Sequence, residues 1–281
     1  MKILSITDIN YIQYAHNFYL QLKKYNLHKK WVLYCDTQET LDSVMALNLD
    51  CEIRLHKQTL PNRWARHPSF LPVKIENRTN TNIADASDGY YAAINLFKQE
   101  MIYNYLNEYK NCDVVYSDLD VAVFGDFVTP LTEIIESNVG DQPRRLNFGF
   151  KHYIIVRRDY DRDPQYSGWN RSLVNCGFMF FVNSEDTRRY ISEYHKEITD
   201  QDFGGNCGYQ YCGNVDEIVL TNFIEKNICI TIEIPDQINM IRGLHCFWTP
   251  QQILDFKPLT YHTTFTPCKK EFLQSLGAWH L

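Results

Sequence analysis

The chain has 281 residues, 44% of them hydrophobic and 22% charged, which suits a globular protein with a large core. Its formal net charge of -6 argues against a nucleic-acid binder, which normally carries a basic surface, although local lysines can still bind an anionic ligand. The nine cysteines are scattered and odd in number, so we expect free thiols in a reducing compartment. The first apolar run is too short for a signal peptide and no stretch approaches a membrane span, so the expected location is cytoplasmic.

The N-terminal part of the sequence alternates between strand and helix patterns. Apolar runs predict strands at 2–6, 31–34 and 51–55. Apolar residues at helical spacing predict helices at 11–25 and 38–47. This order predicts an α/β fold with a parallel sheet and right-handed crossovers.

The middle of the chain holds the clearest motif. Residues 56–90 are polar and rich in proline, so we expect loops, and a helix is predicted over 92–109. An apolar strand then runs from 112 into Asp118-Leu119-Asp120, and a second apolar run, 121–124, is expected to continue it. The second half predicts, in chain order, strands at 148–156 and 176–182, helices at 186–199 and 215–226, and short strands and loops over 228–281.

The two aspartates after this strand are candidate metal ligands. Side chains alternate along a strand, so Asp118 and Asp120 point the same way if the backbone stays extended. Adjacent carboxylates repel unless a positive charge lies between them, and a divalent cation that prefers oxygen ligands is a natural occupant. The plainer alternative is a pair of solvated or helix-capping aspartates at a strand end.

The end of the first predicted strand offers polar and aromatic groups. Thr7 and Asp8 can hydrogen-bond a base or a ribose, and Tyr11 can stack on a nucleobase. The alternative is an ordinary helix cap made by Asp8 or Asn10. The sequence leaves both interpretations open.

Two further segments place polar residues beside regular elements. In Asn175-Cys176-Gly177 the glycine allows close approach of the backbone to a ligand, and the alternative is a simple turn into a strand. Asp216 and Glu217 begin a helix, where the helix dipole by itself favours acids. The functional interpretation places Asp216 near a reacting group.

The tail contains a histidine followed by lysines. His262 is a candidate third metal ligand, with His245 as the competing candidate, and either Lys269 or Lys270 can neutralise a phosphate. A structural role for a single histidine is the alternative.

Taken together and in this order, these segments resemble the GT-A superfamily of nucleotide-diphosphate-sugar transferases. The resemblance is strongest to its retaining branches, the glycogenin-like and galactomannan galactosyltransferase-like families. It extends from Lys2 to about Lys270, and the matching motifs are Tyr116 to Asp120, Asn175-Cys176-Gly177, Asp216-Glu217, and His262 with Lys269.

The resemblance implies a single GT-A domain, 1–281, with a Rossmann-like, mixed but mainly parallel central sheet flanked by helices. Residues 1–125 would form the nucleotide-binding half and 126–281 the acceptor-binding half. It implies Mn²⁺ or Mg²⁺ held by Asp118, Asp120 and His262. It implies that Asn175 and Asp216 face the sugar and the acceptor. The implied donor contacts come from Thr7, Asp8, Tyr11, Lys98, Asp118 and Lys269.

The expected activity is transfer of a hexose or pentose from a UDP- or GDP-linked sugar to a hydroxyl of a glycan, glycolipid or protein-linked sugar, with retention. The sequence departs from the family pattern at Glu217, where glutamine is usual, and at Thr263-Thr264, where a glycine-containing stretch is usual. Two alternatives remain: a non-catalytic nucleotide-sugar-binding module, and a haloacid-dehalogenase-type phosphatase, which also has a D-x-D after an apolar strand. In such phosphatases the motif lies near the N-terminus, whereas here it lies at mid-chain.

Overall fold

A computed structural model gives the structure of the protein. It describes residues 1–57, 89–138, 146–156, 170–200, 215–226, 230–241, 248–263 and 268–281.

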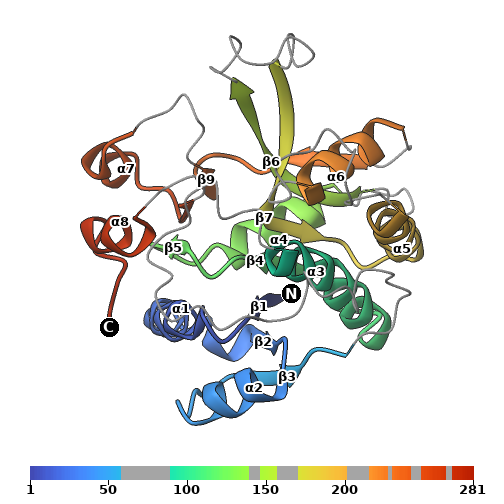
Figure 1. Cartoon of the computed structure of the whole chain (residues 1–281). Helices are drawn as coiled ribbons and strands as arrows, with labels where there is room; N and C mark the ends of the chain where they lie inside the picture. The colour runs from blue at the N-terminus through green and yellow to red at the C-terminus, as the bar shows by residue number, and fades with distance from the viewer. Residues whose placement is uncertain are drawn as a thin grey trace, which may run out of the picture.

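A seven-stranded mixed sheet forms the centre of the molecule, in the order β3-β2-β1-β4-β7-β6-β8 (Figure 1). The first four strands of this order run parallel, β7 is antiparallel to both of its neighbours, and β8 is parallel to β6. The strands are β1 (Lys2–Thr7), β2 (Trp31–Cys35), β3 (Glu52–Leu55), β4 (Val114–Ser117), β6 (Leu146–Val156), β7 (Asn170–Phe181) and β8 (Ile230–Glu233).

Helices cover both faces of this sheet because successive strand residues point to opposite sides. Ile3 and Leu33 pack with α1, α2 and α4, whereas Leu4 and Val32 pack with α3, α5 and α6. The helices are α1 (Ile12–Lys24), α2 (Gln38–Met45), α3 (Gly89–Glu108), α4 (Val128–Ser137), α5 (Glu185–Asp200) and α6 (Val215–Lys226), with a short 3-10 turn, η1 (His28–Lys30), before β2. The two cores give the three-layer arrangement expected of an α/β fold.

A small second sheet lies beside the first, in the order β5-β10-β9. Its strands are β5 (Val121–Val123), β9 (Asn239–Ile241) and β10 (Thr260–His262), and it packs with α7 (Pro250–Phe256) and α8 (Lys269–Ser275). The α7 helix begins with a capping box in which Thr249 and Gln252 exchange side-chain and backbone bonds, followed by proline at the first turn.

The predicted mixed, mainly parallel sheet is confirmed, and the helices and strands predicted at 11–25, 31–34, 38–47 and 215–226 lie within a residue or two of the observed ones. Two expectations are wrong: the tail predicted as short strands and loops also contains the helices α7 and α8, and the run 121–124 does not continue the strand before it. The chain turns at Asp118 to Asp120 and enters the second sheet, because β5 pairs with β10 rather than with a strand of the central sheet. The predicted loops at 56–90 lie almost wholly outside the described residues.

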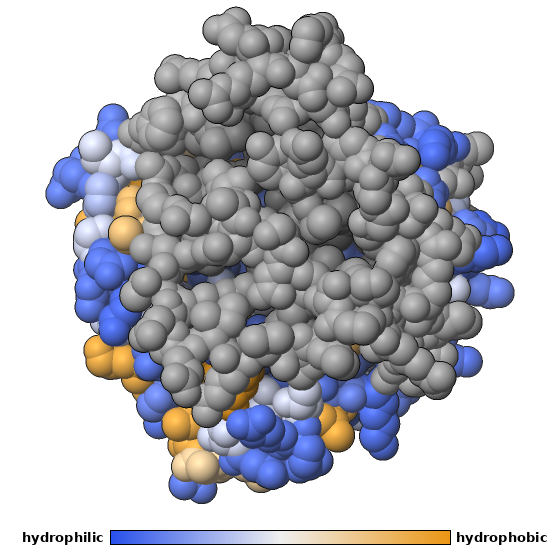
Figure 2. Space-filling model, in the orientation of Figure 1, coloured by the Kyte–Doolittle hydropathy of each residue, from blue (hydrophilic) through white to orange (hydrophobic). Residues whose placement is uncertain are grey.

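Within the described residues, no helix combines the length and the apolar character needed to cross a bilayer. Over the coloured part of the face in Figure 2, hydrophilic residues predominate and hydrophobic ones form small separate groups, some toward the edge where Figure 1 places α2. Met45 at the end of α2 is one of the exposed apolar side chains.

Candidate metal and nucleotide site

The D-x-D segment lies where the two sheets meet. β4 ends at Ser117 and β5 begins at Val121, so Asp118 and Asp120 occupy the turn between them. In the second sheet His262 pairs with Val121, which brings its ring beside Asp120 from the far end of the sequence. The pairing of β5 with β10 therefore assembles the three residues.

These three residues form a compact group of ligand atoms. One ligand atom from each of Asp118, Asp120 and His262 lies within 4.8 Å of the other two, and this is the one such group of potential metal ligands found in the part of the chain that the structure describes. Nε2 of His262 is 3.3 Å from Oδ1 of Asp120 and 3.6 Å from Oδ2 of Asp118.

Asp118 is held from two sides. The hydroxyl of Tyr116 donates to its Oδ1 at 2.5 Å, and its backbone N–H donates to the carbonyl of Gly177 at 2.7 Å. Burial raises the pKa of the Asp118 carboxyl above its usual value, although Lys98 and His262 oppose the rise. A carboxylate in such surroundings is favoured once a cation lies next to it.

Asp120 already has a cationic partner in this structure. The ammonium of Lys269 lies 2.5 Å from its Oδ2, and the Thr263 hydroxyl donates to its backbone carbonyl at 2.8 Å. Burial alone would raise the pKa of Asp120, but Lys269 and then His262 outweigh it and hold the pKa well below its usual range. Asp120 therefore stays ionised.

The donor set fits a divalent ion such as Mn²⁺. Two carboxylate oxygens and an imidazole nitrogen are ligands that Mn²⁺ accepts. Ligands held about 2.2 Å from one ion lie at most about 4.4 Å apart, and the 3.3 and 3.6 Å separations from His262 are within that limit. The residues present can therefore hold such an ion with only small side-chain movements.

Gly177 makes room for the imidazole. A Cβ atom built on Gly177 would lie 2.0 Å from Cε1 of His262 and 2.6 Å from Oδ2 of Asp118. A close approach at this glycine was expected, and within the described residues the groups that approach it are the side chains of His262 and Asp118. Any side chain here would push the ring away from the aspartates.

Asn175, predicted to face the sugar, is fully buried. Its side-chain amide is bonded to protein groups on both sides, including His262 and Glu217. Asp216, predicted beside it, lies in the first turn of α6, and its side chain is outside the described residues, as are the competing His245 and Thr264.

The predicted nucleotide-binding segment lies at the carboxyl end of β1. Oδ1 of Asp8 accepts the backbone N–H groups of Asn10 at 2.7 Å and Tyr11 at 3.0 Å, so this carboxylate stabilises the turn before α1. The N-cap position of α1 is Tyr11, which has no side-chain cap, so neither Asp8 nor Asn10 is the helix cap of the plainer interpretation. The Tyr11 ring packs on Tyr14 at 5.1 Å between centroids. The Thr7 hydroxyl donates to the backbone carbonyl of Asp8.

The two lysines of interest differ in their surroundings. Lys98 is buried in α3, with its ammonium 3.2 Å from the carbonyl of Cys176 and 5.1 Å from the ring of Tyr116. Lys270 lies over the ring of Trp279 at 5.2 Å, so of the two tail lysines Lys269 is the one at the aspartates.

Sequence reasoning missed the residues that hold the ligands. Tyr116 and Thr263 were noted only as neighbours of motif residues, yet each bonds an aspartate of the motif. The hydroxyl of Tyr116 could have been anticipated, because residues two apart on a strand point to the same face. No sequence pattern pairs Thr263 with Asp120, which lie in different segments.

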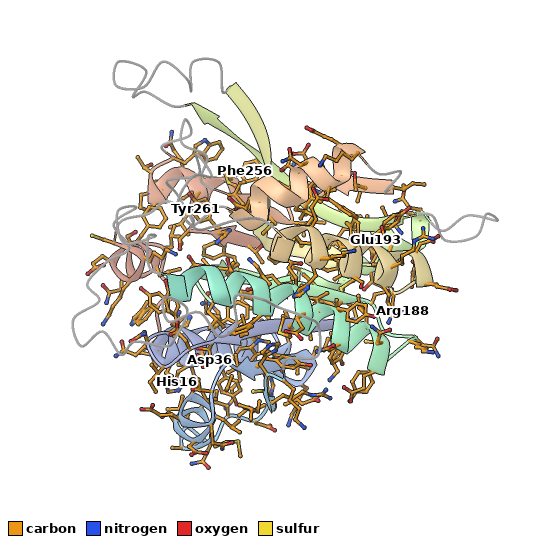
Figure 3. All side chains as sticks on the ribbon, turned by 45° about the vertical axis from the view of Figure 1, so that its right-hand side comes forward. His16, Asp36, Arg188, Glu193, Phe256 and Tyr261 are labelled. Atoms are coloured by element: carbon orange, nitrogen blue, oxygen red, sulfur yellow. The ribbon has the colours of Figure 1, made fainter. Side chains whose placement is uncertain are left out.

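Figure 3 shows the carboxyl end of β2 and the second sheet on the same side of the view. In Figure 3, Asp36 at the carboxyl end of β2 and Tyr261 in β10 lie on the left, whereas Arg188 and Glu193 of α5 lie on the right. The carboxyl ends of parallel strands are where open α/β sheets bind ligands.

Comparison with solved structures identifies the fold. No family model and no curated protein matches the chain. The structure of the galactosyltransferase LgtC in complex with donor and acceptor sugar analogs is similar at 15% identity and a TM-score of 0.51, over 100% of this chain and 97% of that one.

Two other solved structures are more distant. The mouse xyloside xylosyltransferase 1 has 12% identity and a TM-score of 0.47, covering 94% of this chain and 97% of its own. The glycosyltransferase GlyE of Streptococcus pneumoniae has 14% identity and a TM-score of 0.47, covering 98% of this chain and 60% of its own. The sheet order together with the similarity to LgtC shows that this chain has the GT-A fold of nucleotide-sugar transferases.

Proposed function

We propose that this protein is a metal-dependent glycosyltransferase that moves a hexose or pentose from a UDP- or GDP-linked donor to a hydroxyl acceptor, with retention. The observation that carries the proposal is the group formed by Asp118, Asp120 and His262, with Lys269 beside it, at the carboxyl edge of a GT-A sheet. The LgtC structure contains donor and acceptor sugar analogs, which supports the same pair of substrates here. The acceptor is a glycan, a glycolipid or a protein-linked sugar.

The residues divide the work between the leaving group and the sugar. Mn²⁺ or Mg²⁺ held by Asp118, Asp120 and His262 would supply positive charge to the departing diphosphate. Lys269, once released from Asp120, adds an ammonium that can contact a phosphate oxygen. Thr7, Asp8 and Tyr11 are assigned to the nucleoside, Lys98 to the donor side of the site, and Asp216 to the sugar and acceptor.

The reaction breaks the bond between the anomeric carbon and the diphosphate oxygen and forms one between that carbon and the acceptor hydroxyl oxygen. The sugar develops positive charge at the anomeric centre, as in other glycosyl transfers. For retention the acceptor attacks from the face that the diphosphate leaves, so a leaving phosphate oxygen is placed to take the hydroxyl proton. Lys269 and Lys98 keep positive charge near that phosphate.

The test is calorimetry of UDP- and GDP-sugars with and without Mn²⁺, followed by assays of donor hydrolysis and transfer. We expect one class of donor to bind only with the metal, and Asp120→Asn to lower turnover by about 10²-fold or more, because a charged metal ligand is lost. Asp255→Asn is the control, since Asp255 is exposed on α7. Full turnover in the Asp120 variant would refute the metal assignment. Donor binding without hydrolysis or transfer would support the non-catalytic module instead.

A further inference from the structure

A chain of buried hydrogen bonds leads from α6 to the far side of His262. Glu217 Oε1 accepts from Nδ2 of Asn175 at 3.1 Å, and Oδ1 of Asn175 lies 2.9 Å from Nδ1 of His262. These three side chains are fully or almost fully buried, and they link α6, which packs on the central sheet, to β10 of the second sheet. The chain ends at the nitrogen of His262 that does not face the aspartates.

The orientation of the Asn175 amide is fixed by two backbone N–H groups, which can only donate hydrogen bonds. The backbone N–H of Gly177 can only donate, and it lies 3.2 Å from Oδ1 of Asn175, so that atom must be the oxygen. The other atom is then the NH₂ group, which donates to Glu217. The Cys176 N–H also donates to the same Glu217 oxygen, at 3.4 Å, which keeps this oxygen an acceptor.

It follows that Nδ1 of His262 must carry a hydrogen. A carbonyl oxygen can only accept, so the 2.9 Å contact with Asn175 requires an N–H on the ring nitrogen that faces it. The lone pair of a neutral ring is then on Nε2, the atom that faces Asp118 and Asp120. We propose that Glu217 and Asn175 are positioning residues that lock His262 in the tautomer able to bind the metal. This inference rests on the proposed function.

The backbone of β7 supports this arrangement with an irregularity at the site. Gly149 of β6 pairs with Phe180, but Lys151 pairs with Asn175, so the stretch 176–179 of β7 bulges away from the β6 ladder. Side chains of α6 bond the β7 backbone here: Glu217 accepts from Cys176, and Thr221 accepts from Val174 at 3.0 Å. Bulges of this kind often re-aim side chains next to active sites.

Thr221 provides a matched control because it shares one task with Glu217 but not the other. The two residues lie four apart on one face of α6, and both bond the β7 backbone. Of these two residues, Glu217 is the one that also bonds the side chain of Asn175. A variant that merely loosens the docking of α6 should therefore resemble Thr221→Val, whereas a variant that frees Asn175 should also affect His262.

The first test is the binding of Mn²⁺ alone, measured by calorimetry without nucleotide. We expect Glu217→Leu and Asn175→Leu to weaken binding by about 10- to 100-fold, the usual effect of losing a partner behind a metal ligand. Glu217→Gln retains an acceptor oxygen and should stay within about threefold of the unmodified protein, as should Thr221→Val. Equal losses in Thr221→Val and Glu217→Leu, or unchanged affinity in Asn175→Leu, would overturn the proposal.

The second test needs no variant and no metal. Nitrogen-15 NMR of the intact, metal-free protein should show a hydrogen on Nδ1 of His262, protected from exchange by its burial. A His262 ring without a hydrogen on Nδ1 would overturn the proposal even if every variant bound Mn²⁺ weakly. If the unmodified protein does not bind Mn²⁺, the proposed function fails, while the NMR result still decides the tautomer.

Discussion

At the scale of single residues, we assign two tasks to Lys269. In the structure its ammonium neutralises Asp120. With a metal ion on the aspartates, we propose that the same ammonium contacts the diphosphate. Its neighbour Lys270 points to Trp279 instead, so adjacent lysines separate the effect of local charge from the effect of position.

Replacing Lys269 with methionine should weaken the binding of UDP or GDP in the presence of Mn²⁺ by about 10- to 100-fold, the range expected for a lost charged hydrogen bond of about 1.5 to 3 kcal/mol. Binding of Mn²⁺ alone should remain, because the ligands are untouched. Lys270→Met is the control and should change nucleotide affinity less than about threefold. Calorimetry measures the affinities for Mn²⁺ and for the nucleotide. Equal losses of nucleotide affinity in the two variants would show that the location of Lys269 beside Asp120 does not matter.

The candidate metal ligands could be predicted from the sequence better than the residues that hydrogen-bond to them. The resemblance to the GT-A superfamily implied Asp118, Asp120 and His262 as one group, and the three lie together. The residues alone pointed to the two aspartates but left His262 and His245 as competing candidates. The contacts of Tyr116 and Thr263 were not predicted, since they depend on where the backbone turns. Asn175 was predicted at the site, but its burial between Glu217 and His262 follows from the docking of α6, which no local pattern reveals.

At the scale of elements, two glycines in β6 and β7 have different reasons to lack a side chain. A Cβ on Gly149 would lie 1.9 Å from the ring of Phe180, inside the core, whereas one on Gly177 would strike His262. Both substitutions overpack the protein, but only the second one acts on the metal ligands.

We therefore expect Gly149→Ala to lower the free energy of unfolding by about 1 to 3 kcal/mol while the folded protein binds Mn²⁺ normally. Gly177→Ala should weaken Mn²⁺ binding by about tenfold or more, because the His262 ring is displaced. Urea unfolding and calorimetry on both variants separate the two effects. Normal Mn²⁺ affinity in Gly177→Ala would contradict the assembly of the site described here.

The packing of α5 against α3 contains a histidine with an altered pKa. Burial lowers the pKa of His195 below 6.5. Glu100 opposes this lowering and His56 reinforces it. Below pH 6.5 the unfolded chain therefore binds more protons than the folded one, and the free energy of unfolding falls as the pH drops.

His195→Gln should reduce this acid sensitivity, measured as the difference in urea stability between pH 8 and pH 5.5. His16→Gln on α1, where the side chain is only partly buried, is the control. An unchanged pH dependence in His195→Gln would mean that other groups dominate in this range.

Most elements could be predicted because their apolar periodicity is local. The short helices α7 and α8 of the tail were not predicted. The run 121–124 was misassigned, since nothing in its composition distinguishes the continuation of a strand from entry into another sheet. The strand that pairs with this run is β10, which lies near the C-terminus, so a contact distant in sequence places the run in the second sheet.

At the scale of the whole molecule, the C-terminal segment is tied to α1. The fully buried Asn17 donates to the carbonyl of Ala278 at 3.0 Å and accepts the N–H of His280 at 2.7 Å. The ring of Trp279 packs edge-on against Tyr14 at 5.3 Å. Figure 1 shows α8 and the C-terminus next to α1. This docking holds the segment that begins with Lys269.

Asn17→Ala should lower the free energy of unfolding by about 1 to 3 kcal/mol, because the buried carbonyl of Ala278 loses its partner, as does the N–H of the exposed His280. It should also weaken nucleotide binding in the direction of Lys269→Met, since the tail that carries this lysine is released. Gln13→Ala, exposed on the same helix, is the control. A destabilised variant with normal nucleotide affinity would show that the tail docking is not needed to place Lys269.

The central claim is that Asp118, Asp120 and His262 hold one divalent ion next to the donor diphosphate. A crystal structure with Mn²⁺ and UDP or GDP tests it most directly, through the anomalous signal of the metal. We expect one Mn²⁺ bound by both aspartates and by Nε2 of His262, with the ammonium of Lys269 moved from Asp120 to a phosphate oxygen. Aspartates without metal in such a crystal, or Mn²⁺ bound elsewhere, would contradict it.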